Sequence, residues 1–273
     1  MTINCKGTLI DLSSPKVMGI LNITPDSFFD GGKYKDESAI LNQVDKMLLE
    51  GATFIDVGAY SSRPGAAHIS EAEELQRIIP VIDLLIKNYP EIIISVDTFR
   101  SKVAEATVNS GAAIINDISG GNMDTNMFKT VANLQVPYIL MHMLGTPQNM
   151  QQNPVYDDVV KDIISFFAKQ ILDLHQLKVN DIIIDVGFGF GKTIAHNFKI
   201  LSNLELFKSL DAPILAGISR KSMLYKTLDI SAQEALNATT SANTIALLNG
   251  ANILRVHDVK EAVEAVKIVE QVN

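Results

Sequence analysis

Polar residues stand at the points where short apolar runs of this sequence end, and together they could bind one polar ligand. The five are Asp97, Asn116, Asp185, Lys221 and Arg255. A continuous run of Ile, Val and Leu that stops at a polar residue is typical of a buried parallel strand. Asp and Asn can also cap helices. The repetition at strand after strand, with a lysine and an arginine in the set, favours one shared site.

The apolar runs predict the strands that must position these side chains. They cover Val17–Leu21, Thr53–Val57, Ile92–Val96, Ala113–Ile115, Tyr138–Met141, Ile182–Val186, Ile214–Gly217 and Asn252–Val256. The segments between them mostly repeat apolar residues at helical spacing. Eight strands that alternate with helices predict an α/β fold, a (β/α)8 TIM barrel with its active site at the carboxyl ends of the strands. A doubly wound open sheet is the alternative, because the pattern does not show whether the sheet closes.

Two local patterns predict further features of the fold. Ser70 and Glu73 have the spacing of a capping box ahead of a helix, and Pro80 is expected to kink or divide that helix. Residues 1–12 alternate weakly between apolar and polar types. This alternation predicts a short N-terminal β-hairpin that covers the bottom of the barrel.

Composition limits the class of protein. The chain has 273 residues, of which 47% are hydrophobic and 20% charged, and a net charge of −8. These values predict one folded domain over residues 1–273, with no bulk field that would attract nucleic acid or an anionic membrane. Cys5 is the one cysteine, which excludes an internal disulfide and a zinc site made of cysteines. No apolar run is long enough for a signal peptide or a membrane span, so a cytoplasmic location is expected.

The glycine-rich stretch 185–193 looks at first like a phosphate-binding loop. A P-loop requires glycine at the position of Val186, and the dinucleotide pattern fails because its third glycine comes one residue early. We therefore expect a tight loop that approaches a flat ligand, with Phe190 as an aromatic wall. His142 follows the preceding strand and is expected to be structural, as isolated histidines usually are.

The loops after other strands carry polar groups suited to anions. Asn22 ends the first strand, and Arg63 lies among serines after the second. Ser219 follows the seventh strand, and Arg255 and His257 end the eighth. Barrels often bind phosphate at the loops after strands seven and eight, so these residues predict an anion site there.

Ordered motifs along nearly the whole chain resemble one family. They are MGILNITPDSFFDGG, IDVGAYSSRPGA, ISVDTFRSKVAEA, IINDISGG, DVGFGFGKT, GISRKS and RVHDV. This set resembles dihydropteroate synthase, an enzyme of the folate pathway. The resemblance implies a barrel that joins 6-hydroxymethyl-7,8-dihydropterin pyrophosphate to p-aminobenzoate and releases pyrophosphate with Mg²⁺. The reaction would be a dissociative substitution through a pterin cation, in a homodimer.

The resemblance also implies a role for each site residue. The pterin would be bound by Asp97, Asn116, Asp185, Lys221 and Arg255. Pyrophosphate would be bound by Asn22, Arg63, Arg255 and His257, with Asn22 also holding Mg²⁺. The p-aminobenzoate pocket would consist of Phe28, Ser62, Arg63, Pro64, Phe190, Ser219 and Lys221. Catalysis itself would depend on Asp97, Lys221, Arg255 and His257.

The chain departs from the family pattern at two positions. Ser62 stands where the family usually has threonine, and Val186 stands where it has proline. Serine keeps the hydroxyl group, and valine restores a backbone N–H, so the stiffness of the loop is affected more than the class of reaction.

Two other functions stay open at this point. A pterin-binding methyltransferase domain that serves a corrinoid would share Asp97, Asn116 and Asp185 but would not need the cationic set. A non-catalytic pterin-binding or regulatory paralogue would be expected to lose the ligands of the leaving group. Mg²⁺-dependent release of pyrophosphate distinguishes an enzyme from such a paralogue.

Overall fold

Eight parallel strands close into a barrel, in the order β10-β3-β4-β5-β6-β7-β8-β9. The structure is a computed structural model that describes residues 1–23, 33–61, 68–150 and 154–272, and the side chains of these except residues 33–36. The barrel strands are β3 (Lys16–Asn22), β4 (Phe54–Gly58), β5 (Ile94–Asp97), β6 (Ile114–Asp117), β7 (Tyr138–Met141), β8 (Ile182–Asp185), β9 (Ile214–Ala216) and β10 (Ile253–Val256). Closure excludes the open sheet and confirms the predicted (β/α)8 barrel.

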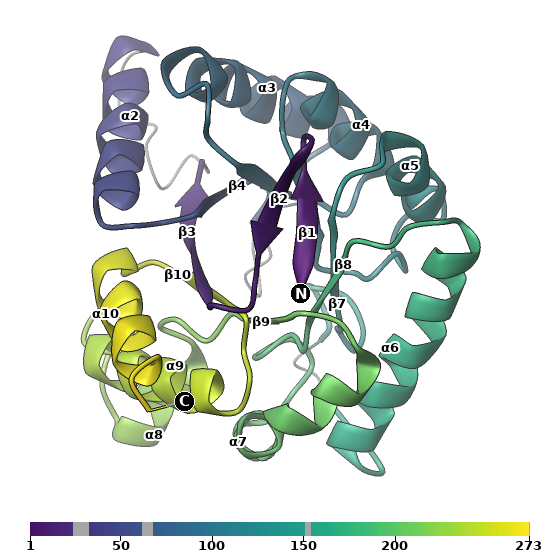
Figure 1. Cartoon of the computed structure of the whole chain (residues 1–273), viewed down its shortest axis with the longest axis vertical. Helices are drawn as coiled ribbons and strands as arrows, with labels where there is room; N and C mark the ends of the chain where they lie inside the picture. The colour runs from purple at the N-terminus through teal and green to yellow at the C-terminus, as the bar shows by residue number, and fades with distance from the viewer. Residues whose placement is uncertain (24–32, 62–67, 151–153, 273) are drawn as a thin grey trace.

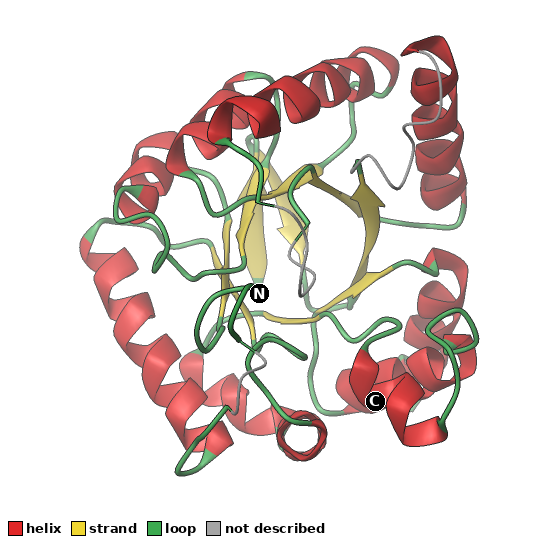
Figure 2. Ribbon diagram, turned by 180° about the vertical axis from the view of Figure 1, so that it is seen from behind, coloured by secondary structure: helices red, strands yellow, loops and turns green. Residues whose placement is uncertain are grey.

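Helices surround the barrel as an outer ring (Figures 1 and 2). They are α2 (Lys33–Leu49), α3 (Glu71–Asn88), α4 (Ser101–Asn109), α5 (Met127–Leu134), α6 (Val159–Gln176), α7 (Ile194–Ser202), α8 (Ser222–Leu228), α9 (Leu236–Leu248), α10 (Val259–Val269) and the 3-10 helix η1 (Leu204–Leu210). Within the described ranges, none of these helices is long and apolar enough to span a bilayer.

The expected division of helix α3 at Pro80 was wrong. The helix runs unbroken from Glu71 to Asn88 with Pro80 inside it. Proline removes one backbone N–H donor, but Ile78, Ile82 and Leu85 on the inner face of this helix are fully buried, and their packing holds it against the barrel. Half of the expected capping box forms, because the Ser70 hydroxyl accepts from the Glu73 N–H at 3.1 Å while the Glu73 carboxylate pairs with an arginine of the next turn.

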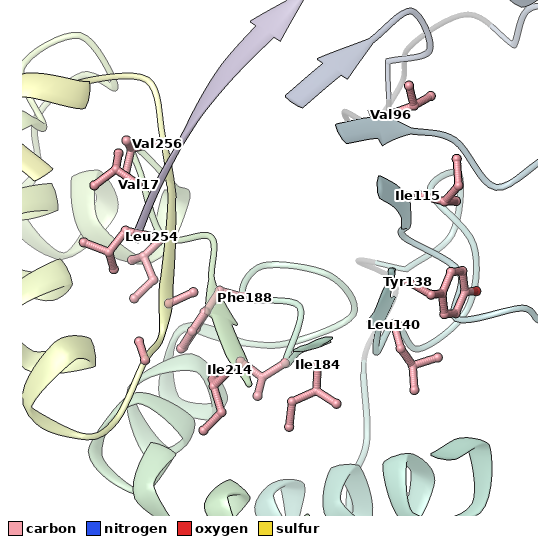
Figure 3. Packing of buried hydrophobic residues seen from close by; sticks show 14 of the residues in the cluster. Val17, Val96, Ile115, Tyr138, Leu140, Ile184, Phe188, Ile214, Leu254 and Val256 are labelled. Atoms are coloured by element: carbon pink, nitrogen blue, oxygen red, sulfur yellow. The ribbon is translucent and has the colours of Figure 1, made fainter. Parts of the chain in front are cut away.

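The strands carry two sets of side chains, one on each side of the barrel wall. One set packs outward against the helices and includes Val96, Ile115, Leu140 and Ile184, which Figure 3 shows. The other set fills the lower part of the interior and consists of Met18, Phe54, Ile114, Ile139, Ile183, Leu215 and Ile253. Both faces of each strand are therefore buried, which explains why the sequence shows continuous apolar runs instead of alternation.

Interior positions recur every second residue along a strand. Two residues after Phe54, Ile114, Ile183 and Ile253 come Asp56, Asn116, Asp185 and Arg255. A polar layer thus lies directly above the apolar interior layer, at the carboxyl ends of the strands.

The N-terminal hairpin closes the opposite end of the barrel, as predicted. It consists of the antiparallel strands β1 (Thr2–Cys5) and β2 (Thr8–Asp11). In Figure 1 the hairpin crosses the bottom of the barrel, which is the end that faces the viewer. Ile3, Cys5 and Leu12 are buried against the lower interior layer, so the hairpin is part of the barrel core.

We expect the hairpin to contribute to stability through Ile3 and not through its exposed residues. Ile3 is 1% exposed, whereas Leu9 in the same hairpin is 69% exposed. Ile3→Ala should lower the free energy of unfolding by about 2 to 5 kcal/mol, because it removes buried apolar volume. Leu9→Ala is the matched control and should change it by less than about 0.5 kcal/mol. Urea denaturation measures both, and equal effects would contradict this role of the hairpin.

Candidate active site

The register of the parallel strands places four site positions side by side. Asn22 pairs with Gly58, Gly58 with Asp97, and Asp97 with Asn116. A Cβ atom at Gly58 would lie 3.6 Å from Asn22 Oδ1 and 3.7 Å from Asp97 Oδ2. Gly58 therefore lies between an amide oxygen and a carboxylate with no side chain of its own to separate them.

Arg255 joins the polar layer across the interior of the barrel. Its Nε–H donates to Asp56 Oδ2 at 2.6 Å, and its Nη2 donates to Asp97 Oδ2 at 3.0 Å. Burial raises the pKa of Asp97, the nearby Asp56 carboxylate adds to this, and Arg255 partly offsets it. The pKa of Arg255 stays above its ordinary value because the two carboxylates outweigh burial.

Asp56 is a site residue that the sequence reasoning missed. It is completely buried, and it also accepts from the Ser95 hydroxyl at 2.6 Å and from Asn116 Nδ2 at 3.2 Å. It lies inside a strand, not at its end, so it had no place in a search for polar residues that follow apolar runs. Its interior position two residues after Phe54 is the signal that could have found it.

Asn116 presents one polar atom without a protein partner in the part of the chain that the structure describes. Its amide nitrogen donates to Asp56, and its Oδ1 is buried with no hydrogen bond there. Buried acceptors of this kind are usually satisfied, so Asn116 Oδ1 is a candidate acceptor for a ligand N–H group.

Lys221 and Asp185 face one another across a second position that lacks a side chain. A Cβ atom at Gly217 would lie 3.7 Å from Asp185 Oδ2 and 3.9 Å from Lys221 Nζ. The Lys221 ammonium also lies 4.7 Å from the centre of the Phe190 ring and donates to the Phe188 carbonyl. Burial lowers the pKa of Lys221 to about 8, although Asp185 opposes this shift.

Asp185 keeps its orientation through the turn that follows β8. Its Oδ1 accepts from the Gly187 N–H at 2.7 Å, and the residue is 4% exposed. Burial raises the pKa of Asp185, while Lys221 and the Gly187 N–H lower it. A carboxylate that sits opposite an ammonium group can accept two parallel N–H groups from a ligand.

Ser219 and His257 form a separate pair at the mouth of the barrel. The Ser219 hydroxyl lies 3.1 Å from His257 Nδ1 and accepts from the His257 N–H at 3.2 Å. These contacts join the loop after β9 to the loop after β10, two residues beyond Arg255. The pair is therefore placed where barrels bind anions.

The predicted site residues Phe28, Ser62, Arg63 and Pro64 lie outside the described residues. His142 is 7% exposed, and its pKa falls to about 2 because of burial and the nearby Lys192, so it stays neutral.

The site thus has donors, acceptors and an aromatic wall arranged around two positions without side chains. The comparisons with known proteins agree with this chemistry. The family model described as pterin binding enzyme matches residues 18–257. A dihydropteroate synthase of Escherichia coli (strain K12) is 43% identical over 272 residues, which cover 99% of this chain and 96% of the relative.

Solved structures give the same result. A dihydropteroate synthase of Yersinia pestis, solved with a sulfonamide drug complex, has a TM-score of 0.93 and 42% identity, covering 100% of this chain and 99% of that one. The chain belongs to the dihydropteroate synthase family. A Xanthomonas albilineans dihydropteroate synthase with 4-aminobenzoic acid has a TM-score of 0.91 at 37% identity and covers 99% of this chain and 97% of its own. The relatives identify a transferase of folate synthesis, which removes support from the methyltransferase and the non-catalytic alternatives.

We expect Asp56 to be essential for the stability of this dihydropteroate synthase barrel. Asp56→Asn leaves the Arg255 guanidinium with one carboxylate partner in place of two, so it should lower the free energy of unfolding by about 3 kcal/mol. Asp83→Asn, at an exposed position of α3, is the matched control and should change it by less than about 0.5 kcal/mol. Thermal or urea unfolding at neutral pH measures both, and a neutral effect of Asp56→Asn would show that the Asp56–Arg255 contact does not stabilise the fold.

Proposed function

We propose that residues 1–273 form one domain that joins 6-hydroxymethyl-7,8-dihydropterin pyrophosphate to p-aminobenzoate and releases pyrophosphate. The observation that carries this proposal is the polar layer at the carboxyl ends of the strands, in which Asp185 and Lys221 lie on either side of Gly217 and the buried Asn116 Oδ1 has no partner among the described residues. Those groups match the edge of a pterin, which offers N–H donors, a carbonyl group and ring acceptors.

The pterin would be held by its edge. Asp185 would accept two parallel N–H groups, Asn116 would accept a third through Oδ1, and Lys221 would donate to the pterin carbonyl. Asp97 and Arg255 would lie at the other ring. Hydrogen bonds that involve a charged group contribute about 1.5–3 kcal/mol each, so the loss of any one should weaken binding by roughly one or two orders of magnitude.

Bond breaking would precede bond making. The carbon–oxygen bond to pyrophosphate breaks and its electron pair leaves with that group. The amine nitrogen of p-aminobenzoate then forms the new carbon–nitrogen bond and loses a proton to solvent. The Asp97 carboxylate would stabilise the intervening pterin cation electrostatically, because its charge lies close to the developing positive charge.

Pyrophosphate would be bound by Asn22, Arg63, Arg255 and His257. The guanidinium has five N–H groups, and two of those of Arg255 point at Asp56 and Asp97. His257 is exposed at the mouth of the barrel, where a departing anion would pass. Arg63 lies outside the described residues, so its part rests on the sequence alone.

The second substrate would bind beside the first. Phe190, Ser219 and Lys221 supply an aromatic wall, a hydroxyl and a cation, which suit a benzoate. Phe28, Ser62, Arg63 and Pro64 complete the proposed pocket from the sequence. The Xanthomonas albilineans relative binds 4-aminobenzoic acid, and this supports the proposed substrate of the present chain.

The residues of the site fit Mg²⁺ that arrives with the substrate. Mg²⁺ is commonly held by one or two protein oxygens together with phosphate oxygens and water. Asn22 Oδ1 lies beside Gly58 and is an oxygen that could bind the ion. Among the described residues, no cluster of three acidic, histidine or cysteine ligands occurs. Asn22 would hold the ion, which supplies charge neutralisation of the leaving group.

We also propose a cytoplasmic homodimer that binds neither nucleic acid nor membranes. Ile194 and Phe198 of α7 and Ile245 and Leu248 of α9 are exposed apolar residues on helices that contact one another, so this side of the barrel is the candidate interface. Three other apolar residues of α9 are buried, namely Ala242, Ala246 and Leu247.

The first test is pyrophosphate release from the dihydropterin substrate in Mg²⁺, with and without p-aminobenzoate. Release should require p-aminobenzoate, and Lys221→Ala should reduce kcat/KM by about 10- to 100-fold, because one charged hydrogen bond is lost. Lys226→Ala is the matched control. Lys226 is an exposed residue of helix α8, which Lys221 caps at its N-terminus, and its replacement should keep full activity. A folded protein that binds the pterin but releases no pyrophosphate would instead indicate a binding protein.

The rate should also report the pKa of Lys221. This pKa is lowered to about 8, so the ammonium is charged below that pH and becomes neutral as pH rises through it. The kcat/KM for the pterin substrate, which reports groups of the free enzyme, should therefore fall about tenfold per pH unit above pH 8. Lys221→Arg should shift this fall to higher pH, because guanidinium stays charged. An alkaline limb at the same pH in Lys221→Arg would assign it to another group.

A further inference from the structure

Lys192 is a buried lysine for which the proposed reaction has no direct use, and burial lowers its pKa well below the ordinary value. It ends the glycine-rich loop after β8 and is 3% exposed. Its ammonium lies 3.0 Å from His142 Nδ1 and donates to the carbonyls of His142 at 3.2 Å, Gly187 at 3.0 Å and Phe190 at 2.9 Å. The lysine that suggested a phosphate-binding loop therefore points into the protein and binds main-chain oxygens.

Stability alone is a weak reason for this arrangement. In the described structure, the hydrogen-bond partners of Lys192 are carbonyls and a neutral imidazole, and no carboxylate forms a salt bridge with it. Burial of an ammonium without such a bridge carries a large desolvation cost, and apolar residues of similar volume often replace buried charges without loss of stability. A role in placing the loop accounts for a cation at this position.

The two loops that Lys192 joins are in direct main-chain contact. A Cβ atom at Gly187 would lie 2.0 Å from the His142 carbonyl oxygen, and one at Gly191 would lie 2.5 Å from the Leu144 carbonyl oxygen. Both glycines have positive φ values, of 67° and 64°. The loop after β8 thus lies tightly on the loop after β7, and the Lys192 ammonium binds carbonyls of both.

The contacts of Lys192 affect Phe190 and Asp185 unequally. Asp185 is held by strand pairing with Met141 and by the Gly187 N–H. Phe190 lies beyond the strand, where its N–H donates to the Gly187 carbonyl at 3.1 Å and its carbonyl accepts from Lys192. Loss of the ammonium should therefore move Phe190, whose ring faces Lys221, more than it moves Asp185.

We propose that Lys192 is a positioning residue that fixes Phe190 against Lys221 and thereby sets the affinity for p-aminobenzoate. This inference rests on the proposed function, in which Phe190 is a wall of the pocket for that substrate. Lys192 touches neither substrate, and it acts through the main chain of the loop. This role also explains the run of glycines, since only residues without side chains allow the two loops to lie close enough for one ammonium to join them.

The test compares Lys192→Met, Lys192→Gln and Lys199→Met. Lys199 is the matched control, because it lies on the adjoining helix α7 with a side chain that is 50% exposed. KM for p-aminobenzoate comes from pyrophosphate release, and Kd for the dihydropterin pyrophosphate comes from calorimetry without p-aminobenzoate. Lys192→Met should raise KM by about tenfold or more, as expected for one or two lost hydrogen bonds. Lys192→Gln keeps amide donors and should raise it less, while the pterin Kd stays within about threefold in both variants.

Several outcomes of this test would overturn the proposed role of Lys192. A KM that changes no more than in Lys199→Met would overturn the proposal, and so would an equal loss of affinity for both substrates, which indicates a general structural role. Failure of both Lys192 variants to fold, monitored by circular dichroism, would also overturn it, because the barrel itself would then require the cation. Failure of the proposed function is distinct, since the unmodified protein would then release no pyrophosphate.

Discussion

The buried contact of Arg255 with Asp56 and Asp97 is the interaction on which the rest of the site depends. A closed barrel of this size has an interior filled by side chains, so charged groups can be placed there only if they neutralise one another. Arg255 does this across the barrel, from β10 to β4 and β5. The same Asp56 carboxylate then orients Ser95 and Asn116. Because removal of one member of such a group leaves others without partners, the layer behaves as a unit.

Space for a ligand in this layer comes from side chains that are missing. Gly58 and Gly217 each occupy a position where a Cβ atom would contact two site groups. At Gly58 these groups are Asn22 and Asp97, and at Gly217 they are Asp185 and Lys221. The polar layer is therefore a set of fixed donors and acceptors with glycine at two of its positions, which is the preorganisation that binding and electrostatic catalysis require.

The sequence predicted the parts of the structure that depend on burial and strand direction. The strands, the closure of the bottom by the hairpin and the polar residues Asp97, Asn116, Asp185 and Arg255 at strand ends follow from apolar runs and from the parallel arrangement, while Lys221 begins helix α8. Asp56 and Lys192 were missed for the opposite reason, since a polar residue inside a strand and a lysine that binds carbonyls both depend on tertiary contacts. Pro80 does not divide α3, because packing of the helix face outweighs one lost hydrogen bond.

The charges of the described site set a condition on how the reaction can proceed. The site holds the carboxylates of Asp56, Asp97 and Asp185 and the cations of Lys221 and Arg255, and the chain as a whole carries a net charge of −8. A cluster in which cations do not outnumber carboxylates can orient a neutral pterin, but it has little net attraction for pyrophosphate. Under the proposed function, the charge of the leaving group would therefore be balanced by groups added to this cluster, such as Mg²⁺ held by Asn22 or the guanidinium of Arg63. The barrel end would then recognise the pterin ring, and those added charges would supply the affinity for the anion.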